Sequence, residues 1–268
     1  MENFETATAV AARAEGSYTW HVPAGWAVGR GAWGGLVIGS LINAITDAEP
    51  DDARVLRSVS AEIAAPATVG EHEVVVTNLR RGSGLSTWGA TTTNADGELV
   101  ARLTAVLAAD RESAVDMDYS TWDLPSAPTA PPAAEVAVVD MAGLAPEFVQ
   151  HLDIRPLSGM AYSGRGSQTL GYVRLASPVE HTAASLIGLV DGWWAAAIVT
   201  LDRFRPIATI NFSANILVDP ASVAPDELLL HHGFATGSHA GFTSEQRRLW
   251  SADGRLVVDN LQSTVLIK

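Results

Sequence analysis

The chain has 268 residues, of which 47% are hydrophobic, so it is long enough for one large domain or two small ones with a sizeable core. A formal net charge of −13 at pH 7 argues against nucleic acid and anionic membrane surfaces as partners, because both attract basic proteins. The absence of cysteine excludes disulfides, thiolate metal ligands and a cysteine nucleophile.

The N-terminal segment gives no sign of export. Residues 1–6 are acidic and precede no long apolar run, so we expect no signal peptide and a cytoplasmic location. The longest apolar stretch, residues 183–201, is interrupted by Gly188, Asp191 and Gly192. It is too short and too broken to span a membrane, and it predicts a buried helix instead.

The first half of the chain predicts a strand, a long helix and then an antiparallel meander. The strand over residues 18–23 ends at Pro23, and the glycine-rich loop 29–35 leads into an apolar helix over residues 36–48. The β-branched content then rises, and turns such as Asp96-Gly97 separate the next runs. Four strands are expected, over residues 55–64, 71–79, 86–93 and 99–108.

The same order of elements returns after a segment with the composition of a linker. Residues 113–146 contain closely spaced prolines among Ser, Thr and Ala. A strand over residues 170–176 and a long apolar helix over residues 181–201 follow. The second meander is expected over residues 207–218, 227–232, 241–250 and 256–267. We therefore expect an N-terminal unit (1–112), a Pro-rich linker (113–146) and a C-terminal unit (147–268).

Two stretches of sequence occur twice. Residues 94–100 (Asn-Ala-Asp-Gly-Glu-Leu-Val) return as 251–257 (Ser-Ala-Asp-Gly-Arg-Leu-Val), and residues 58–63 resemble 211–216. A repeat of this length predicts two copies of one fold packed together. In each copy a curved antiparallel sheet would bury the apolar helix, and the edge strands of the two copies could join into one sheet.

Three polar residues break the symmetry between the copies. Asp191 lies in the second apolar helix, where burial of an ionised carboxylate costs several kcal/mol unless partners compensate it. Gln262 aligns with Ala105, and Thr209 begins a strand at an apolar position of the first copy. A local cap for Asp191 and an exposed face for Gln262 are the structural alternatives. A carboxylate in one copy but not in the other predicts one active site per chain, and Gln262 and Thr209 gain weight beside it.

Other motifs do not lead to a site. The run Gly29-Arg-Gly-Ala-Trp-Gly34 matches G-x-G-x-x-G, but a meander follows it instead of further parallel strands, so no dinucleotide cofactor is expected. His231 and His232 are adjacent on a strand and point to opposite faces, which is poor geometry for a metal. Two pairs of arginines are expected on solvated faces, with a clamp for ligand phosphates as the alternative: Arg203 with Arg205, and Arg247 with Arg248.

Together these features resemble the double-hotdog acyl-CoA thioesterases, the bacterial type II enzymes and their relatives. The most specific segment, Ile207-Ala-Thr-Ile-Asn-Phe-Ser213, is similar to the family's Ile-Ala-Thr-Ile-Asp-His-Ser, with Asn211-Phe212 in place of Asp-His. The turn at Trp33-Gly34-Gly35, the Pro-rich connection and a Gln on the last strand also match, so the resemblance covers nearly the whole chain. It implies an α+β double hotdog, in which each of two tandem repeats wraps an antiparallel sheet around a long central helix.

The resemblance also implies the reaction, which is hydrolysis of an acyl-CoA thioester to the free acid and CoA. The family's Asp, Thr or Ser, and Gln fall on Asp191, Thr209 and Gln262, which would bind and polarise the attacking water without a covalent acyl-enzyme. No metal and no cofactor are implied. The partner is the acyl-CoA substrate, and because hotdog sheets bury faces in pairs we also expect a homodimer or higher homo-oligomer.

Binding of the substrate is assigned to four residues near the two helices. Backbone N–H groups of Gly34 and Gly35, or of their counterparts in the second half, would stabilise the oxyanion. Trp33 and Trp193 would border an acyl tunnel, although core packing explains them equally well. Two alternatives remain open. One is a non-catalytic acyl-CoA or acyl-carrier binding protein of the same fold. The other is a hotdog hydratase or dehydratase, which ranks last because the histidine at position 181 lies ten residues from the aspartate.

Overall fold

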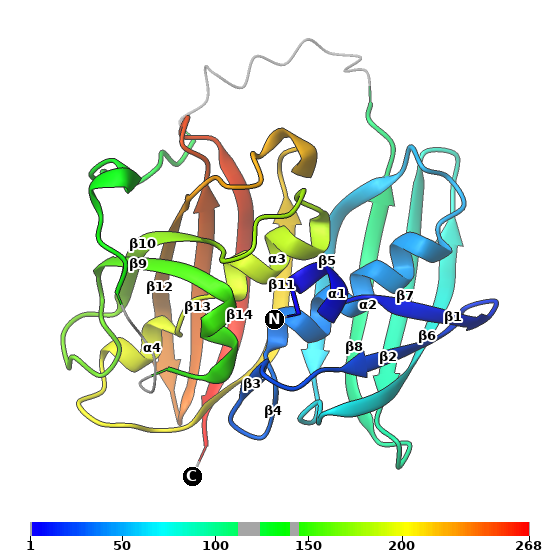
Figure 1. Ribbon diagram of the computed structural model, residues 1–268, viewed down its shortest axis with the longest axis horizontal. Coiled ribbons are helices and arrows are strands. Elements are labelled where there is room, and N and C mark those ends of the chain that lie inside the picture. The colour runs from blue at the N-terminus through cyan, green and yellow to red at the C-terminus, as the bar shows by residue number, and fades with distance from the viewer. Residues whose placement is uncertain (1, 112–123, 140–144, 268) are drawn as a thin grey trace.

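One antiparallel sheet of twelve strands crosses the described part of the molecule (Figure 1). The computed structural model describes residues 2–111, 124–139 and 145–267. In spatial order, the N-terminal half contributes β1 (Val10–Ala14), β2 (Ser17–Val22), β6 (Gly70–Arg81), β7 (Leu85–Thr93), β8 (Leu99–Ala108) and β5 (Val55–Ile63). The C-terminal half continues with β11 (Ile207–Ile216), β14 (Leu256–Leu266), β13 (Phe242–Trp250), β12 (Leu229–His239), β10 (Gln168–Leu175) and β9 (Leu152–Ser158). A separate two-stranded ribbon consists of β3 (Ala27–Val28) and β4 (Gly31–Ala32).

The two halves meet where β5 pairs with β11. Ser58 lies opposite Asn215 and Glu62 lies opposite Asn211, in an antiparallel ladder. The expected junction of edge strands is therefore this pair, and it hides two edges that would otherwise be free to pair with other chains.

The ladders of the two halves have the same register. Trp88 pairs with Ala105 between β7 and β8, and Glu245 pairs with Gln262 between β13 and β14. Each residue of the second pair follows its counterpart by 157 positions, which is also the spacing between the two Asp-Gly turns. Positions 157 residues apart can therefore be compared directly across these strands.

Two helices lie side by side near the centre of the molecule (Figure 1). They are α2 (Gly34–Ala48) and α3 (Ala183–Asp191), one from each half. The short helix α1 (Phe4–Ala7) packs onto both, because a Cβ added at Gly39 or Gly188 would come within 3.1 Å or 2.8 Å of the Phe4 ring. Glycine at these two positions therefore leaves room for an aromatic ring over the helix pair. The described residues also form 3₁₀ turns over residues 133–135, 147–151 and 220–222.

The prediction of one long helix over residues 181–201 is wrong beyond Asp191. A capping box at Thr182 and Ser185 starts α3, and the helix ends at Asp191 with Gly192 as its C-cap. The chain is then extended at Ala195 before a separate helical turn, α4 (Ala196–Val199). The second half therefore has a break at the centre of the apolar stretch that the sequence predicts as one helix.

Side chains of β13 explain this break. Nη1 of Arg247 donates to the carbonyl of Trp193 (3.1 Å), and Glu245 accepts from the backbone N–H of Ala196 (2.9 Å). These hydrogen bonds satisfy backbone groups that a continuous helix would have paired internally. The tertiary environment therefore overrides the helical tendency of the apolar sequence.

The strands agree closely with those predicted from the sequence. The largest difference is in β12, which extends to His239 and was expected to end at residue 232. The strands β1 and β9 were not predicted, and neither were the short elements α1, β3 and β4. Of the expected linker, residues 113–123 and 140–144 lie outside the described residues.

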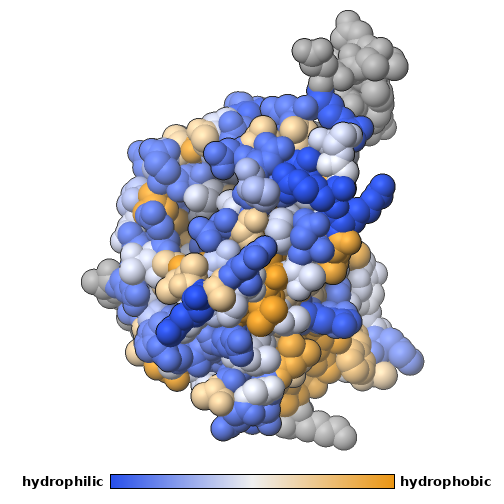
Figure 2. Space-filling model, turned by 90° about the vertical axis from the view of Figure 1, so that its right-hand side faces the viewer, coloured by the Kyte–Doolittle hydropathy of each residue, from blue (hydrophilic) through white to orange (hydrophobic). Residues whose placement is uncertain are grey.

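On the outer side of the N-terminal half, polar side chains cover most of the surface and apolar ones gather toward the lower right (Figure 2). The core lies between the sheet and the helices, where Leu36, Ile38 and Leu186 are fully buried. None of the helices formed by the described residues has both the length and the apolar character needed to cross a membrane.

The residue that follows the last turn of α2, Glu49, has a buried carboxylate. Glu49 is 6% exposed and accepts hydrogen bonds from Ser86 Oγ, from Trp88 Nε1 (2.9 Å) and from Arg81 Nη1. Burial alone would raise the pKa of Glu49, but the hydrogen bonds from Ser86, Trp88 and Arg81 outweigh it and lower the pKa to about 2. This cluster ties the helix to β6 and β7.

We expect Glu49→Gln to lower the free energy of unfolding at pH 7 by about 2–3 kcal/mol, because the buried ion pair loses its anion. The folded pKa of Glu49 lies below its ordinary value of 4.5, so its stabilisation is complete above pH 4.5 and is lost as the pH falls toward 2. Urea unfolding at several pH values should therefore show the gap between variant and wild type closing over that range. The control Glu71→Gln, on an exposed side chain, should change stability by less than about 0.5 kcal/mol; a constant gap would contradict the assignment.

Candidate active site

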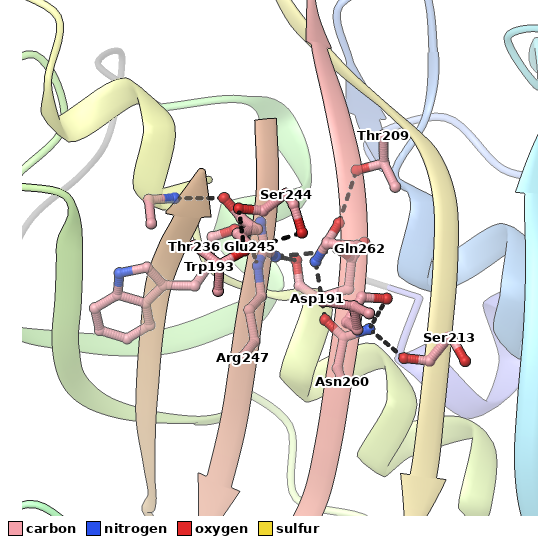
Figure 3. A network of polar contacts seen from close by, with 12 residues as sticks. Asp191, Trp193, Thr209, Ser213, Thr236, Ser244, Glu245, Arg247, Asn260 and Gln262 are labelled. Carbon is pink, nitrogen blue, oxygen red and sulfur yellow. Dashed lines mark hydrogen bonds and ion pairs between the residues drawn. The ribbon is translucent and has the colours of Figure 1, made fainter. Parts of the chain in front are cut away.

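Asp191 lies at the junction of the two halves, as the last residue of α3 (Figure 3). Its side chain is 8% exposed. Trp33, which precedes α2, donates from Nε1 to the carbonyl oxygen of Asp191 (3.1 Å), and a Cβ added at Gly34 would lie 3.1 Å from Asp191 Oδ2. The carboxylate of the second half therefore faces the N-terminus of the helix of the first half.

The environment of Asp191 changes its proton affinity. Burial raises the pKa of Asp191 from its ordinary value of 3.8 to about 6, while the Arg247 guanidinium and the backbone N–H of Gly35 act in the opposite direction. At neutral pH the carboxylate is therefore mostly ionised and is still basic enough to accept a proton. This combination suits a general base.

The other two predicted residues lie close by. Gln262 is fully buried on β14, and its amide is 3.0 Å from Thr209 Oγ1 on β11. One end of the same amide is 2.8 Å from Nε of Arg247, whose Nη1 is 3.3 Å from Asp191 Oδ1. The structure therefore brings Asp191, Thr209 and Gln262 into one network through Arg247 (Figure 3). The alternative of an exposed face for Gln262 is wrong.

Arg247 and Glu245 of β13 belong to this network, although the sequence predicts a solvated face for the pair at 247–248. That prediction is wrong for Arg247, which is 3% exposed and paired with the fully buried Glu245. Arg248 points to the opposite face of the sheet, where it pairs with Asp259 (3.1 Å). Adjacent strand residues alternate between faces, so the two arginines have different surroundings.

The repeat contains the signal that would have identified both residues. At the spacing of 157 positions, Glu245 corresponds to Trp88 and Arg247 corresponds to Ala90. The same comparison that distinguishes Gln262 therefore also distinguishes these two. Each is a buried polar residue at a position where the first half has an apolar one.

The two tryptophans expected to border an acyl tunnel are buried. Trp33 stacks on Phe148 with ring centroids 4.9 Å apart, and Trp193 stacks on His231 at 4.9 Å. His231 is fully buried, whereas the adjacent His232 on β12 is half-buried. Burial lowers the pKa of His231 well below its ordinary value, and the nearby Arg247 lowers it further. His231 is therefore neutral where it faces the network.

The remaining candidate features of the described residues lie away from this network. A cavity of about 480 Å³ lies on the N-terminal half of the sheet and is lined by residues of β5 to β8, including Glu62 and Arg102 but none of the three predicted site residues. Among the described residues, no group of three or more His, Asp or Glu side chains could hold a metal ion. Arg203 and Arg205 are exposed, as expected.

Comparison with known proteins gives consistent results for both halves. The acyl-CoA thioesterase N-terminal domain profile matches residues 22–108, and the acyl-CoA thioesterase C-terminal domain profile matches residues 123–266. No protein among the curated sequences matches the chain.

Solved structures with a similar fold cover nearly the whole chain. A hot dog fold protein of unknown function from Alicyclobacillus acidocaldarius is 25% identical with a TM-score of 0.88, covering 99% of this chain and 98% of its own. A putative thioesterase II from Thermobifida fusca is 21% identical with a TM-score of 0.83, covering 100% and 98%. An acyl-CoA thioesterase II from Mycobacterium marinum is 15% identical with a TM-score of 0.76, covering 98% of each chain. The fold is therefore a hotdog fold.

Proposed function

The chain belongs to the acyl-CoA thioesterase family, and we propose that it hydrolyses acyl-CoA thioesters to the free acid and CoA. The observation that carries this proposal is the buried carboxylate of Asp191, with its pKa raised to about 6, in one network with Thr209 and Gln262. Such a group can take a proton from water near neutral pH and return it to a leaving group.

The proposed reaction needs no covalent intermediate. A water held between Asp191 and the Thr209–Gln262 pair attacks the thioester carbonyl carbon while its proton passes to the Asp191 carboxylate. The tetrahedral intermediate then collapses, the carbon–sulfur bond breaks, and the CoA thiolate takes up the proton. One water is consumed, and one acid and one thiol are formed.

The N-terminus of α2 is proposed to stabilise the oxyanion. Of the two glycines assigned there, Gly35 directs its N–H toward Asp191, so it orients the base, and Gly34 is proposed as the oxyanion donor. Trp33 and Trp193 are proposed to border the acyl group next to Asp191. Their support is the hydrogen bond from Trp33 to Asp191 and the position of Trp193 two residues beyond it.

At the level of the whole chain, the proposal is a double hotdog with two tandem repeats, over residues 1–112 and 147–268, joined by the Pro-rich linker 113–146. The common register of the two meanders and the separate matches of the two domain profiles support it. The homo-oligomer and the cytoplasmic location remain predictions.

One observation favours the alternative of a non-catalytic acyl-CoA or acyl-carrier binding protein. Asp191 is 8% exposed and Gln262 is fully buried, so a substrate must open a path to reach them. A hydratase or dehydratase is less well supported. His181, at the start of α3, contacts Ser185 (3.2 Å) at the opposite end of the helix from Asp191, so the two do not form a dyad.

We expect the protein to release free thiol from at least one member of a panel of acyl-CoAs of increasing chain length, followed with a thiol-reactive dye. Turnover supports the thioesterase, and the chain-length profile reports the size of the acyl site. No turnover across the panel, together with an increase in melting temperature on adding acyl-CoA, would favour the binding protein.

A further inference from the structure

Arg247 is a buried cation at the centre of the polar network. It is 3% exposed, and its Nη1 lies 3.3 Å from Asp191 Oδ1 and donates to the carbonyl of Trp193 (3.1 Å). It therefore contacts the carboxylate of Asp191 and also holds the backbone just after it. Because a guanidinium is planar and offers several donors in fixed directions, these contacts fix both position and angle.

Glu245 holds Arg247 in place. The two side chains lie on the same face of β13 and form an ion pair through Arg247 Nε. The second oxygen of Glu245 accepts from the N–H of Ala196 (2.9 Å), the first residue of α4. The pair therefore spans the break between α3 and α4, directly beside Asp191.

The pair is present only in the half that carries the predicted catalytic residues. At the equivalent positions of the first half, Trp88 and Ala90 belong to an apolar inner face. A buried ion pair is a weak device for stability, since apolar residues of similar volume often stabilise as well or better. Its restriction to the copy with Asp191 therefore points to a role in the site.

Arg247 also sets the orientation of the Gln262 amide. With the amide oxygen toward Arg247, the oxygen accepts from Nε (2.8 Å) and Nη1 (3.3 Å), and the amide nitrogen donates to Thr209 Oγ1 (3.0 Å). The opposite orientation lets the amide nitrogen donate to Asn260 Oδ1 (3.1 Å) and to the Asp191 carboxylate, but it places the amide N–H groups against the guanidinium. We assign the oxygen to the side of the cation, because a charged donor forms the stronger hydrogen bond. The Thr209 hydroxyl proton is then free for the attacking water.

We propose that Arg247, held by Glu245, is a positioning residue of the active site that fixes the Asp191 carboxylate and the Gln262 amide for attack by water. This inference rests on the proposed thioesterase function. It adds to the reaction two residues that do not touch the reacting atoms and act through Asp191 and Gln262.

The charges around Asp191 make the proposal testable by pH. Two charged side chains of β13, Arg247 and Glu245, face Asp191. The Gln262 amide of β14 and the N–H of Gly35 in α2 also face it. His231 of β12 lies beside Arg247 and is neutral. Arg247 stabilises the ionised carboxylate and Glu245 destabilises it. Removing the cation should therefore raise the pKa of Asp191, and removing the Glu245 charge should lower it.

The experiment compares Arg247→Met and Glu245→Gln in the full chain. We expect Arg247→Met to lower kcat by about 100-fold with KM changed by less than about 3-fold, because misplacement of the base affects the chemical step. In the pH profile of kcat/KM, the acid limb is the fall in activity at low pH, and in the wild type Asp191, with its pKa of about 6, sets its midpoint. In Arg247→Met this midpoint should rise by about one pH unit. In Glu245→Gln the limb should move down. Shifts of opposite sign are not expected from a merely structural role.

Two further variants keep the test decisive. Arg247→Lys retains the charge without the planar fork, so it should leave the acid limb in place while lowering kcat by about 10-fold, and it serves if Arg247→Met does not fold. Arg248→Met removes the neighbouring cation on the opposite face and should leave kcat and the pH profile unchanged. Equal activity of Arg247→Met and wild type, or limbs that move together, would overturn the proposal.

A measurement without turnover separates this inference from the proposed function. The ¹³C NMR signal of the Asp191 carboxyl, assigned by its loss in Asp191→Asn, can be titrated in the wild type and in the variants that remove Arg247 or Glu245. Opposite shifts of its pKa support the positioning role even if no acyl-CoA in the panel is hydrolysed. Unchanged titration with an active wild type would remove the positioning role and leave the thioesterase assignment intact.

Discussion

Replacing Asp191 with asparagine is expected to lower kcat for acyl-CoA hydrolysis by about 10³-fold, because an amide cannot take the proton from the attacking water. The substitution keeps the shape of the side chain, and the hydrogen bond from Trp33 to the backbone carbonyl does not depend on the carboxylate. Arg247 keeps Glu245 as its counter-ion. Folding and acyl-CoA binding should therefore be largely retained, with the binding constant within a few-fold of the wild type.

The matched control is Asp259→Asn on β14. Asp259 pairs with Arg248 on the outer face of the sheet, and its side chain is 33% exposed. This variant removes one carboxylate and one ion pair, as Asp191→Asn does, and should leave kcat unchanged. Steady-state thiol release and calorimetric binding of the same acyl-CoA measure both variants. Full activity of Asp191→Asn would contradict its role as the base, and loss of binding together with activity would point to a structural role.

The three candidate site residues could be predicted because each position of the second half can be compared with the equivalent position of the first half. The first half shows which residue an apolar position holds when no chemistry is required, so Gln262 opposite Ala105 was visible from the sequence alone. Arg247 was missed for a physical reason. Neighbouring arginines are typical of a solvated face, and alternation along a strand separates them only once the register is known. The comparison of Arg247 with Ala90 contains that information, but it needs the same alignment extended to β13.

The fold could be predicted where local signals and tertiary packing agree. Turn residues such as Asp96-Gly97 and the rise in β-branched content predict the ends of β7 and β8 to within one residue. The helix over residues 181–201 was overpredicted because its interruption comes from hydrogen bonds that Glu245 and Arg247 make from a distant strand. The strand β1 was missed since four of its five residues are exposed and it has no apolar periodicity.

Replacing Phe212 with alanine is expected to lower the free energy of unfolding by about 3–5 kcal/mol, as is usual for removal of a buried aromatic ring. Phe212 is fully buried on β11, and its ladder partners are Ala61 on β5 and Gln262 on β14. Paired residues on antiparallel strands share a face, so the ring packs at the junction of the halves, beside the predicted site. Urea unfolding measures the loss. The control Phe242→Ala, at 52% exposure on β13, should cost less than about 0.5 kcal/mol.

The position of Phe212 also bears on the mechanism. In the family segment that residues 207–213 resemble, histidine stands at this position, whereas here a phenylalanine offers no proton and no charge. Phe212 is fully buried and pairs with Gln262 in the β11–β14 ladder, so it adds an apolar group beside the network in which burial raises the pKa of Asp191. We therefore expect the cavity in Phe212→Ala to admit water and to lower the acid limb of kcat/KM. A loss of stability with an unmoved limb would mean that the ring serves packing alone, and the low dielectric around Asp191 would then come from Trp33 and the helix pair.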